Sequence, residues 1–566
     1  MSTLPAQPFP SGGLRRLSSK ETLQRAQALN CTVEATAKPS CAGQINVGIF
    51  FDGTGNNRKI DFLDLPPDKR KHSNVVKIFH AFPDSGGNNF RYYIPGVGTP
   101  FPQIQDEGAD LGGPFAWNGE NRITWGLTRL FNAANRFVNG IDLIEESLAG
   151  KIADNMASSL TPPAIRRKIL RTWQANLKQA IAGKKPAIEI INLSVFGFSR
   201  GAAEARAFCN WLFEVCEEAN GGWTFADVPI RLGFLGIFDT VASVGIPNSM
   251  PNFILEGHQS WADGNMHINP AIEQCVHFVA GHEVRAAFPL DSVRSKETYP
   301  ANAKEVMYPG AHSDLGGGYA PNDLGISTNA EDSLAAIPGL QMYHEARKAG
   351  VPLAPWNQLS NTEKRYLTPT ARVVDSFNSY LKAAKIKPGR VEDLHRKHMS
   401  LYLSYRYKYR NQPLSLPFYQ RASAKHKGYI AITSDTFNQR LRNFHIYHNN
   451  PAVPHQDSKK SPPSPHAYYV DPATPDYNLQ ESVNRKLAKI RDKKLPSTAH
   501  EAQSQLLDVL RNIDPNKLTP EIEHFFGNYV HDSMAGFIEM SPRVTNEFKI
   551  NGEGILRYRR IFSEDG

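Results

Sequence analysis

The chain of 566 residues has few cysteines and no long apolar run. Its five cysteines are odd in number and widely spaced, which does not indicate a disulfide framework or a zinc site; they are Cys31, Cys41, Cys209, Cys216 and Cys275. No apolar stretch approaches the roughly 20 residues that a membrane-spanning helix needs. Internal repeats are also absent from the sequence.

The N-terminal sequence MSTLPAQPFPSGGLRRLSSKE lacks the apolar region of a secretory signal peptide. We therefore expect the protein to be made and folded in a cytosol, and to reach any other compartment by another route. Lysine and arginine number 64 against 55 acidic residues, so the net charge is +9. This modest basic excess suits an anionic partner such as a lipid surface or nucleic acid, but it is also common among soluble proteins that bind neither, and we expect no nucleic-acid partner.

Five short apolar runs are present, each followed by a polar or glycine-rich motif. They are residues 45–51, 187–195, 230–238, 275–280 and 304–308. Helical patterns lie between several of them, including an insertion around residues 120–182 that a Pro-Pro pair divides. The pattern predicts an α/β protein with a mostly parallel sheet flanked by helices, of α/β-hydrolase type. Because ligands bind at the carboxyl ends of parallel strands, the motifs should meet at one edge of the sheet.

Three regions follow from this pattern. We expect residues 1–42 to be a flexible or loosely packed lead-in and residues 43–350 to form the catalytic core. Residues 351–566 should form an insertion or lid-like region and a C-terminal extension that pack on the core. Within this last part, residues 355–480 show no clear alternation of strands and helices, residues 450–476 resemble an exposed proline-rich loop, and residues 498–513 look helical.

The sequence Gly197-Phe198-Ser199-Arg200-Gly201 matches the G-x-S-x-G pattern of a nucleophile elbow. The pattern alone is weak, but here it stands between an apolar run and an amphipathic helix, which is the context that an elbow requires. The glycines allow the strand and the helix to approach closely. Ser199 is therefore the candidate nucleophile of a serine esterase.

A nucleophilic serine needs a base and an acid that orients the base. His312 is the candidate base, because it lies in a glycine-rich loop after the last apolar run and follows the serine in the chain. Asp239 directly follows the run at 230–238 and is the favoured acid. Asp291 is an alternative, whereas Asp314 is too close in sequence to His312 to orient it well.

An oxyanion hole needs backbone N–H donors. We expect one from Arg200, which follows the nucleophile, and one from Gly53 or Thr54 in the loop after the first apolar run. Asp52 in this loop is more typical of a turn former than of a metal ligand. The sequence therefore predicts no metal and no cofactor.

Five motifs occur in a fixed order: FFDGTGNN, YYIPGVGT, GFSRGAAEARAF, GIFDTVASVG and YPGAHSDLGGGY. Together they resemble the DUF2235 α/β-hydrolase domain found in type VI secretion lipase effectors of the Tle1 family, over roughly residues 43–350. The resemblance implies an antibacterial phospholipase A that is delivered into the periplasm of target cells. It also implies docking on a VgrG spike protein, a cognate immunity protein and a phospholipid membrane as substrate. The family's serine, aspartate and histidine correspond to Ser199, Asp239 and His312.

One departure from the family pattern concerns the acid. Many members carry an Asp-Glu pair after the strand at 275–280, where this chain has His282 and Glu283. The missing aspartate favours Asp239 as the acid. The late segment Tyr529-Val530-His531-Asp532-Ser533 is also similar to the family, and a buried structural role for His531 is more common than a role as base.

Two interpretations of the segment from Leu401 to Arg410 remain open. Its mixture of tyrosines and cations is typical of a membrane interface. Its spacing also fits a helix packed on the domain. Two other functions compete with phospholipid hydrolysis: an esterase or thioesterase on a soluble acyl substrate, and a degenerate hydrolase domain that serves as a binding component of a secretion apparatus.

Overall fold

The structure is a computed structural model. It describes residues 2–11, 13, 15–29, 41–84, 86–108, 118–156, 163–219, 221–242, 260–285, 288–327, 329–410, 412–443, 445–446, 468–469, 509, 512–536 and 559–563. The proline-rich stretch at 450–476 and the expected helix at 498–513 lie almost wholly outside these residues. In the part of the chain that is described, no helix has the length and apolar character needed to cross a bilayer.

A nine-stranded sheet forms the centre of the fold, and the main path through it runs β1-β10-β8-β7-β4-β2-β3. Every neighbouring pair along this path is parallel. The strands on this path are β1 (Leu4–Pro5), β2 (Ala42–Phe51), β3 (Asn89–Ile94), β4 (Ala187–Phe198), β7 (Val228–Phe238), β8 (Cys275–Ala280) and β10 (Ala303–Tyr308). The five apolar runs of the sequence are thus five strands of one parallel sheet, which confirms the predicted fold class.

Shorter strands complete the sheets. The hairpin of β5 (Glu217–Ala219) and β6 (Gly222–Phe225) pairs with β7 in the antiparallel sense. Two separate pairs are β11 (His445–Ile446) with β12 (Tyr468–Tyr469), and β9 (Leu290–Asp291) with β13 (Ile561–Phe562).

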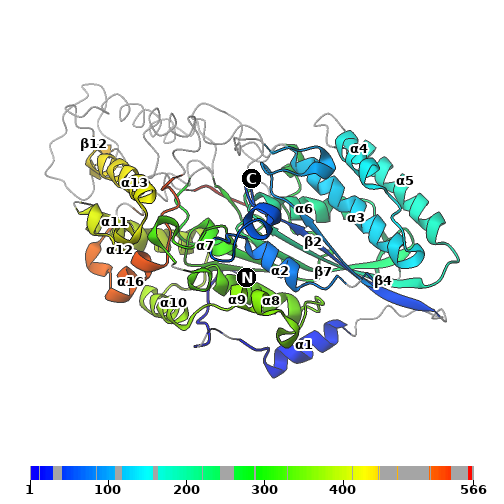
Figure 1. The fold of residues 1–566 in the computed structure, drawn as a ribbon, viewed down its shortest axis with the longest axis horizontal. Helices are drawn as coiled ribbons and strands as arrows, with labels where there is room; N and C mark the ends of the chain where they lie inside the picture. The colour runs from blue at the N-terminus through cyan, green and yellow to red at the C-terminus, as the bar shows by residue number, and fades with distance from the viewer. Residues whose placement is uncertain are drawn as a thin grey trace.

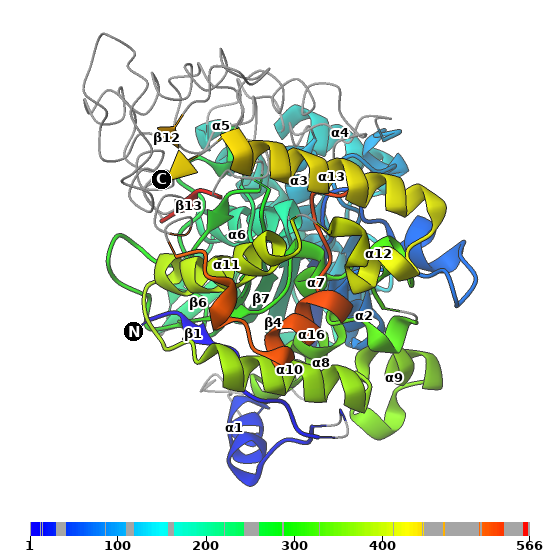
Figure 2. The same cartoon turned by 90° about the vertical axis from the view of Figure 1, so that its left-hand side faces the viewer.

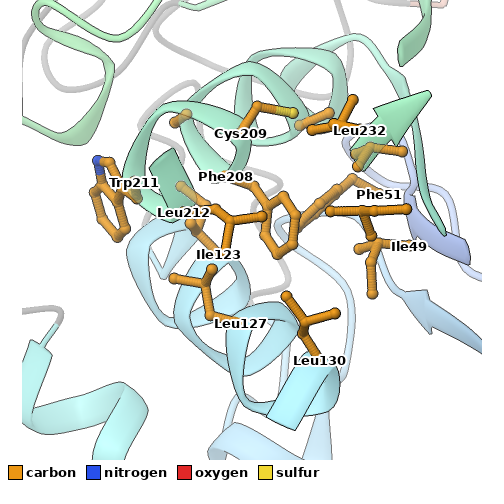
Figure 3. Close-up of a cluster of buried hydrophobic side chains, with 14 of the residues drawn as sticks. Ile49, Phe51, Ile123, Leu127, Leu130, Phe208, Cys209, Trp211, Leu212 and Leu232 are labelled. Carbon is orange, nitrogen blue, oxygen red and sulfur yellow. The ribbon is translucent and has the colours of Figure 1, made fainter. Parts of the chain in front are cut away.

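Helices from the first half of the chain cover one face of the sheet (Figure 1). They are α3 (Gly119–Asn139), α4 (Glu146–Met156), α5 (Pro163–Ile181) and α6 (Arg200–Phe213). Alternate side chains of β2, among them Ile49 and Phe51, point into this layer and meet Leu127 and Leu130 of α3 and Phe208 of α6 (Figure 3). Every second side chain of the strand therefore packs against the apolar faces of the helices, and together they form a hydrophobic core.

The opposite face of the sheet is covered by α2 (Asn74–Ala81) and α8 (Ala336–Lys348), and α9 (Asn361–Leu367) packs against these two helices. Phe50 and Phe196 point to this side and stack with their ring centroids 5.0 Å apart. Phe50 points to this face of the sheet, whereas Ile49 and Phe51 point to the other face, so these three neighbouring positions of β2 are all buried and apolar. Both faces of the sheet are buried, as expected for a parallel sheet.

Residues 355–480, for which the sequence shows no clear alternation, are mainly helical where the structure describes them. The helices are α10 (Ala371–Ala384), α11 (Val391–Lys408), α12 (Pro417–Arg421) and α13 (Ala424–Asn443), and α16 (Pro520–Asn528) packs with them. Figure 2 shows these helices gathered on one end of the molecule. This end contains the carboxyl ends of the strands, because Gly281, which directly follows β8, packs against His398 of α11.

The N-terminal residues are better packed than a flexible lead-in would be. Leu4 and Pro5 form the edge strand β1 beside β10, and Phe9 is buried in the main core. Helix α1 (Ser19–Leu29) contacts α8. The sequence does not predict this pairing, because the segment is rich in proline and glycine and a strand of two residues is too short to show a periodic pattern.

Short helical turns complete the described part of the chain. They are the π-helix η1 (Lys59–Leu63), the small helix α7 (His312–Gly316) and the 3₁₀ turns η2 (Pro102–Ile104), η3 (Ser260–Ala262), η4 (Asp323–Gly325), η5 (Ala330–Asp332), η6 (Trp356–Gln358), η7 (Pro413–Ser415) and η9 (Pro515–Lys517).

Candidate active site

Ser199 occupies a sharp turn between β4 and α6. Its backbone angles are φ 58° and ψ −125°, a conformation that a residue with a side chain adopts only under strain. The serine is buried to 2% exposure at the N-terminus of α6, where the helix dipole favours a developing negative charge. This geometry is that of a nucleophile elbow.

The two glycines of the motif are required by close contacts. A Cβ on Gly197 would lie 2.4 Å from the carbonyl oxygen of Gly201, and a Cβ on Gly201 would lie 2.3 Å from the carbonyl oxygen of Asp52. Neither position has room for a methyl group. The elbow is therefore pressed between its own helix and the loop that follows β2.

Asp239 lies beside the elbow on the neighbouring strand. Phe198 and Phe238 are register partners in β4 and β7, so Ser199 and Asp239 each stand one residue beyond the paired strands. The backbone N–H of Ser199 donates to the carbonyl oxygen of Phe238 at 2.9 Å. The sheet thus places the two candidate residues at the same edge, as the sequence predicts.

His312 begins helix α7 after β10, and its Nδ1 lies 2.6 Å from Oδ2 of Asp239. Its ring packs between Phe198 and Phe288, at centroid distances of 4.7 and 5.0 Å. An ionised Asp239 can only accept, so Nδ1 carries the proton and Nε2 keeps its lone pair as a base. Among the described residues, Ser199 Oγ makes no hydrogen bond with His312; in unliganded enzymes this contact often tightens only when substrate binds.

The electrostatic environment favours this protonation state. Burial lowers the pKa of His312 below its ordinary value, against the opposing effect of Asp239. Burial alone would raise the pKa of Asp239, but the Arg559 guanidinium and His312 hold it well below its usual range. At neutral pH the pair is therefore a neutral imidazole hydrogen-bonded to a carboxylate, the form that a general base requires.

Asp291 does not reach the histidine. Its Oδ2 accepts a hydrogen bond from the backbone N–H of Ala242 at 2.8 Å, and its own N–H donates to the carbonyl oxygen of Thr240. It lies in β9, which pairs with β13. Of the two aspartates considered from the sequence, only Asp239 contacts His312.

Glu283 lies against the backbone of His312. The backbone N–H of His312 donates to Glu283 Oε2 at 3.2 Å, and the hydroxyl of Ser533 donates to Oε1 at 3.1 Å. Burial alone would raise the pKa of Glu283, but the neighbouring guanidinium of Arg285 lowers it to about 2. A negative charge thus lies against the backbone N–H of the candidate base.

The late segment singled out in the sequence makes buried contacts through three consecutive residues, of which Ser533 reaches Glu283 beside His312. His531 Nδ1 lies 2.5 Å from Asp314 Oδ1. Asp532 forms a buried ion pair with Arg406 of α11, and Ser533 bonds Glu283 as described. His531 therefore pairs with Asp314, not with the neighbouring Asp532, and has a partner of its own beside the His312–Asp239 pair.

Candidate oxyanion donors lie in the loop after β2. The N–H of Gly53 donates to the side chain of Asp52 at 2.8 Å, which leaves Thr54 as the candidate donor of the two. The Arg200 side chain donates to the hydroxyl of Thr54. This bond joins the residue after the nucleophile to the β2 loop, so both expected donor segments are held together.

Asp52 has the role of a turn former in this structure. Its carboxylate accepts from Gly53 and, at 2.6 Å, from the hydroxyl of Tyr93. Burial raises its pKa to about 6. Within the described residues, no group of three or more His, Cys, Asp or Glu side chains is placed to hold a metal ion.

The segment from Leu401 to Arg410 is buried over residues 402–406 and partly or fully exposed over residues 407–410. It is the end of α11 and the turn after it, and Arg406 is only 3% exposed. Its guanidinium is occupied by Asp532 and Ser434. The packed-helix interpretation is therefore the correct one for Arg406, and the interfacial interpretation is wrong for this residue.

Sequence reasoning did not identify Arg559, which donates to both carboxylate oxygens of Asp239. It is one of three arginines in a short basic stretch near the C-terminus, with Arg557 and Arg560, and no spacing or motif distinguishes it from the other two.

A parallel sheet with helices on both faces and a strained serine between strand and helix define an α/β-hydrolase-like protein. The chain belongs to the family described as "T6SS, Phospholipase effector Tle1-like, catalytic domain", whose sequence model matches residues 46–216 and 216–345. This places it among phospholipase effectors of the type VI secretion system.

Solved structures give two further comparisons. The chain is similar to an uncharacterised protein from Pseudomonas aeruginosa, known from a crystal structure, with 26% identity and a TM-score of 0.73 over 100% of this chain and 85% of that one. It also matches the Tle1 effector bound to the VgrG spike from the type VI secretion system, with 23% identity and a TM-score of 0.28 over 55% of this chain and 56% of that one. A comparison with curated proteins gives no match.

Proposed function

We propose that the protein is a phospholipase of A type, which hydrolyses acyl esters of membrane phospholipids with Ser199 as nucleophile, His312 as base and Asp239 as the acid that orients it. The observation that carries this proposal is the 2.6 Å contact between His312 Nδ1 and Asp239 Oδ2 at the sheet edge where Ser199 stands in a strained turn. Family membership supports phospholipid as the substrate class.

The reaction begins when Ser199 Oγ attacks the acyl carbonyl carbon and its proton passes to His312 Nε2. The oxyanion accepts hydrogen bonds from the backbone N–H groups of Arg200 and Thr54. The tetrahedral intermediate collapses, and the lysophospholipid leaves with the proton from His312. Water, deprotonated by His312, then attacks the acyl-enzyme and releases the fatty acid.

The biological setting of the proposal follows from the family. We propose that the protein acts as an antibacterial effector that the type VI secretion system delivers to the periplasm of target cells. In the producing cell it associates with a VgrG spike protein and is inhibited by an immunity protein. Membership of the phospholipase effector family supports this setting.

The test is incubation of the purified protein with phospholipid vesicles, followed by measurement of free fatty acid and lysophospholipid. Both products should appear in equal amounts, and Ser199→Ala should reduce the rate by about 10⁶-fold. A short, soluble ester assayed in parallel separates the alternatives: hydrolysis of that ester without vesicle hydrolysis would indicate a soluble acyl substrate. Loss of neither activity in the Ser199→Ala variant would exclude the serine mechanism.

A further inference from the structure

The C-terminal residues reach the catalytic centre although they lie far outside the matched family domain, which ends at residue 345. Ile561 and Phe562 form β13, which runs parallel to Leu290 and Asp291. This pairing fixes the chain two residues before Ile561, where Arg559 enters the protein interior. The Arg559 side chain is fully buried.

Every polar contact that the structure gives Arg559 faces the candidate acid or the backbone around it. Its two terminal nitrogens donate to Asp239, at 3.0 Å to Oδ2 and at 3.2 Å to Oδ1. Its Nε donates to the carbonyl oxygen of Phe288 at 2.9 Å, and a weaker contact reaches the carbonyl oxygen of Ala280 at 3.4 Å. A two-pronged contact with a carboxylate fixes the plane of that carboxylate as well as its position.

Asp239 is thereby held from three sides. Its Oδ1 also accepts from the backbone N–H of Ala280 at 2.9 Å, and its Oδ2 accepts from His312 Nδ1. Without Arg559, a fully buried carboxylate would have only the imidazole and one N–H as partners. Such a carboxylate either takes up a proton, which removes the charged acceptor that orients the imidazole, or draws a proton onto the imidazole, which converts the neutral base to an imidazolium.

We propose that Arg559 is a positioning residue of the active site, which holds Asp239 ionised and correctly oriented and keeps His312 neutral at the pH of catalysis. This inference rests on the proposed serine mechanism. It assigns the last residues of the chain to the catalytic centre, so the enzyme is completed only when its C-terminal segment is in place.

The sign of the electrostatic effect follows from the groups around the pair. Asp239 and Glu283 are negative and favour the imidazolium form of His312, whereas Arg285 opposes it. The positive charge of Arg559 acts on the pair through Asp239, where it stabilises the ionised carboxylate and compensates its negative charge. The groups that face the pair are Glu283, Arg285, Arg559 and His395 of α11. Removing Arg559 therefore leaves excess negative charge and should raise the apparent pKa of His312.

The experiment measures kcat/KM against pH for a short, soluble ester with wild type, Arg559→Met, Arg559→Gln and Arg559→Lys. The Met and Gln variants should lose about 10- to 100-fold near neutral pH, as expected when a charged hydrogen bond is lost. Their acid limb should move upward by about one pH unit, within the range that a neighbouring arginine exerts on an aspartate. The Lys variant should stay closer to wild type in the position of the limb.

Ile561→Ala is the matched control, because it loosens the same C-terminal strand and leaves the guanidinium in place. It should lower the melting temperature without moving the acid limb. Equal acid limbs in wild type and Arg559→Met, or equal shifts in Arg559→Met and Ile561→Ala, would overturn the proposal. If Arg559→Met does not fold, the same comparison between the Gln and Lys variants decides the question.

A double-mutant comparison gives a second decision. In an Asp239→Asn background, Arg559→Met should have little additional effect on kcat, because its action passes through the carboxylate. If Arg559→Met lowered kcat in this background as much as it does in the wild type, the role of Arg559 would be only structural. If the wild type does not hydrolyse the ester, or Ser199→Ala hydrolyses it equally well, the serine mechanism itself fails and this inference falls with it. If the wild type is active and the acid limb of the Arg559 variants does not move, only this inference is contradicted.

Discussion

His312 and Asp239 are 73 residues apart in the chain, yet Nδ1 of one lies 2.6 Å from Oδ2 of the other. The parallel sheet brings them together, because β7 and β10 both end at the edge where α7 begins. Helix α7 packs directly on the elbow, since a Cβ on Gly316 would lie 2.0 Å from the ring of Phe198. The position of the candidate base is thus fixed by the same strand that presents Ser199.

The identity of the acid can be tested with two aspartates that are almost equally buried. Asp239→Asn should reduce kcat by about 10⁴-fold, because an amide cannot hold the imidazole in the required tautomer. Asp291→Asn should have a small effect, since the amide oxygen can still accept the hydrogen bond from Ala242. Steady-state kinetics on a soluble ester measure both, with thermal denaturation as the check on folding. A larger loss in Asp291→Asn would contradict the assignment.

The pH dependence follows from the lowered pKa of His312. Burial favours the neutral imidazole, and only this form can accept the serine proton. We therefore expect kcat/KM to rise with pH along a single acid limb whose midpoint lies below the ordinary histidine value of about 6.5. Asp239 should add no second limb above this, because its pKa is held well below its usual range. A midpoint above neutrality for the wild type would contradict the description of the pair.

We expect Arg406 to stabilise the fold and not to bind lipid. Arg406→Met leaves Asp532 buried without its partner, which should lower the free energy of unfolding by about 3–5 kcal/mol. Lys408→Met is the matched control in the same helix. Its ion pair with Glu523 is partly exposed, with 43% of the lysine side chain accessible, so its loss should cost less than about 1 kcal/mol.

Urea denaturation of both variants measures these differences. Equal stability of Arg406→Met and wild type would show that the buried ion pair is unimportant. Weaker binding to anionic vesicles by a fully stable Arg406→Met variant would restore the interfacial interpretation of this segment.

The meeting of the candidate residues at one edge of the sheet could be predicted because its signals are local. Apolar runs mark the strands, and the residues that follow them at Ser199, Asp239 and His312 meet because parallel strands end together. The elbow has a further local signal in its flanking glycines, which the close contacts of Gly197 and Gly201 explain.

The helices of residues 355–443 were harder to predict because polar aromatic residues form much of their buried stripe. In α11, His395, His398, Tyr402 and Tyr405 are all buried, although hydrophobicity scales treat these residue types as intermediate. Arg559 could not be predicted at all. Its partner is 320 residues away, and nothing in the surrounding basic sequence distinguishes this arginine from its neighbours.

The most direct test of Ser199 as nucleophile is covalent labelling. The wild-type protein would be treated with a fluorophosphonate, which reacts with activated serine hydroxyls, and the modified peptide would be identified by mass spectrometry. We expect a single adduct on Ser199, a parallel loss of phospholipid hydrolysis, and much slower labelling in the Asp239→Asn variant. An adduct on another residue, or full hydrolysis by protein whose Ser199 is completely modified, would contradict the assignment of the nucleophile.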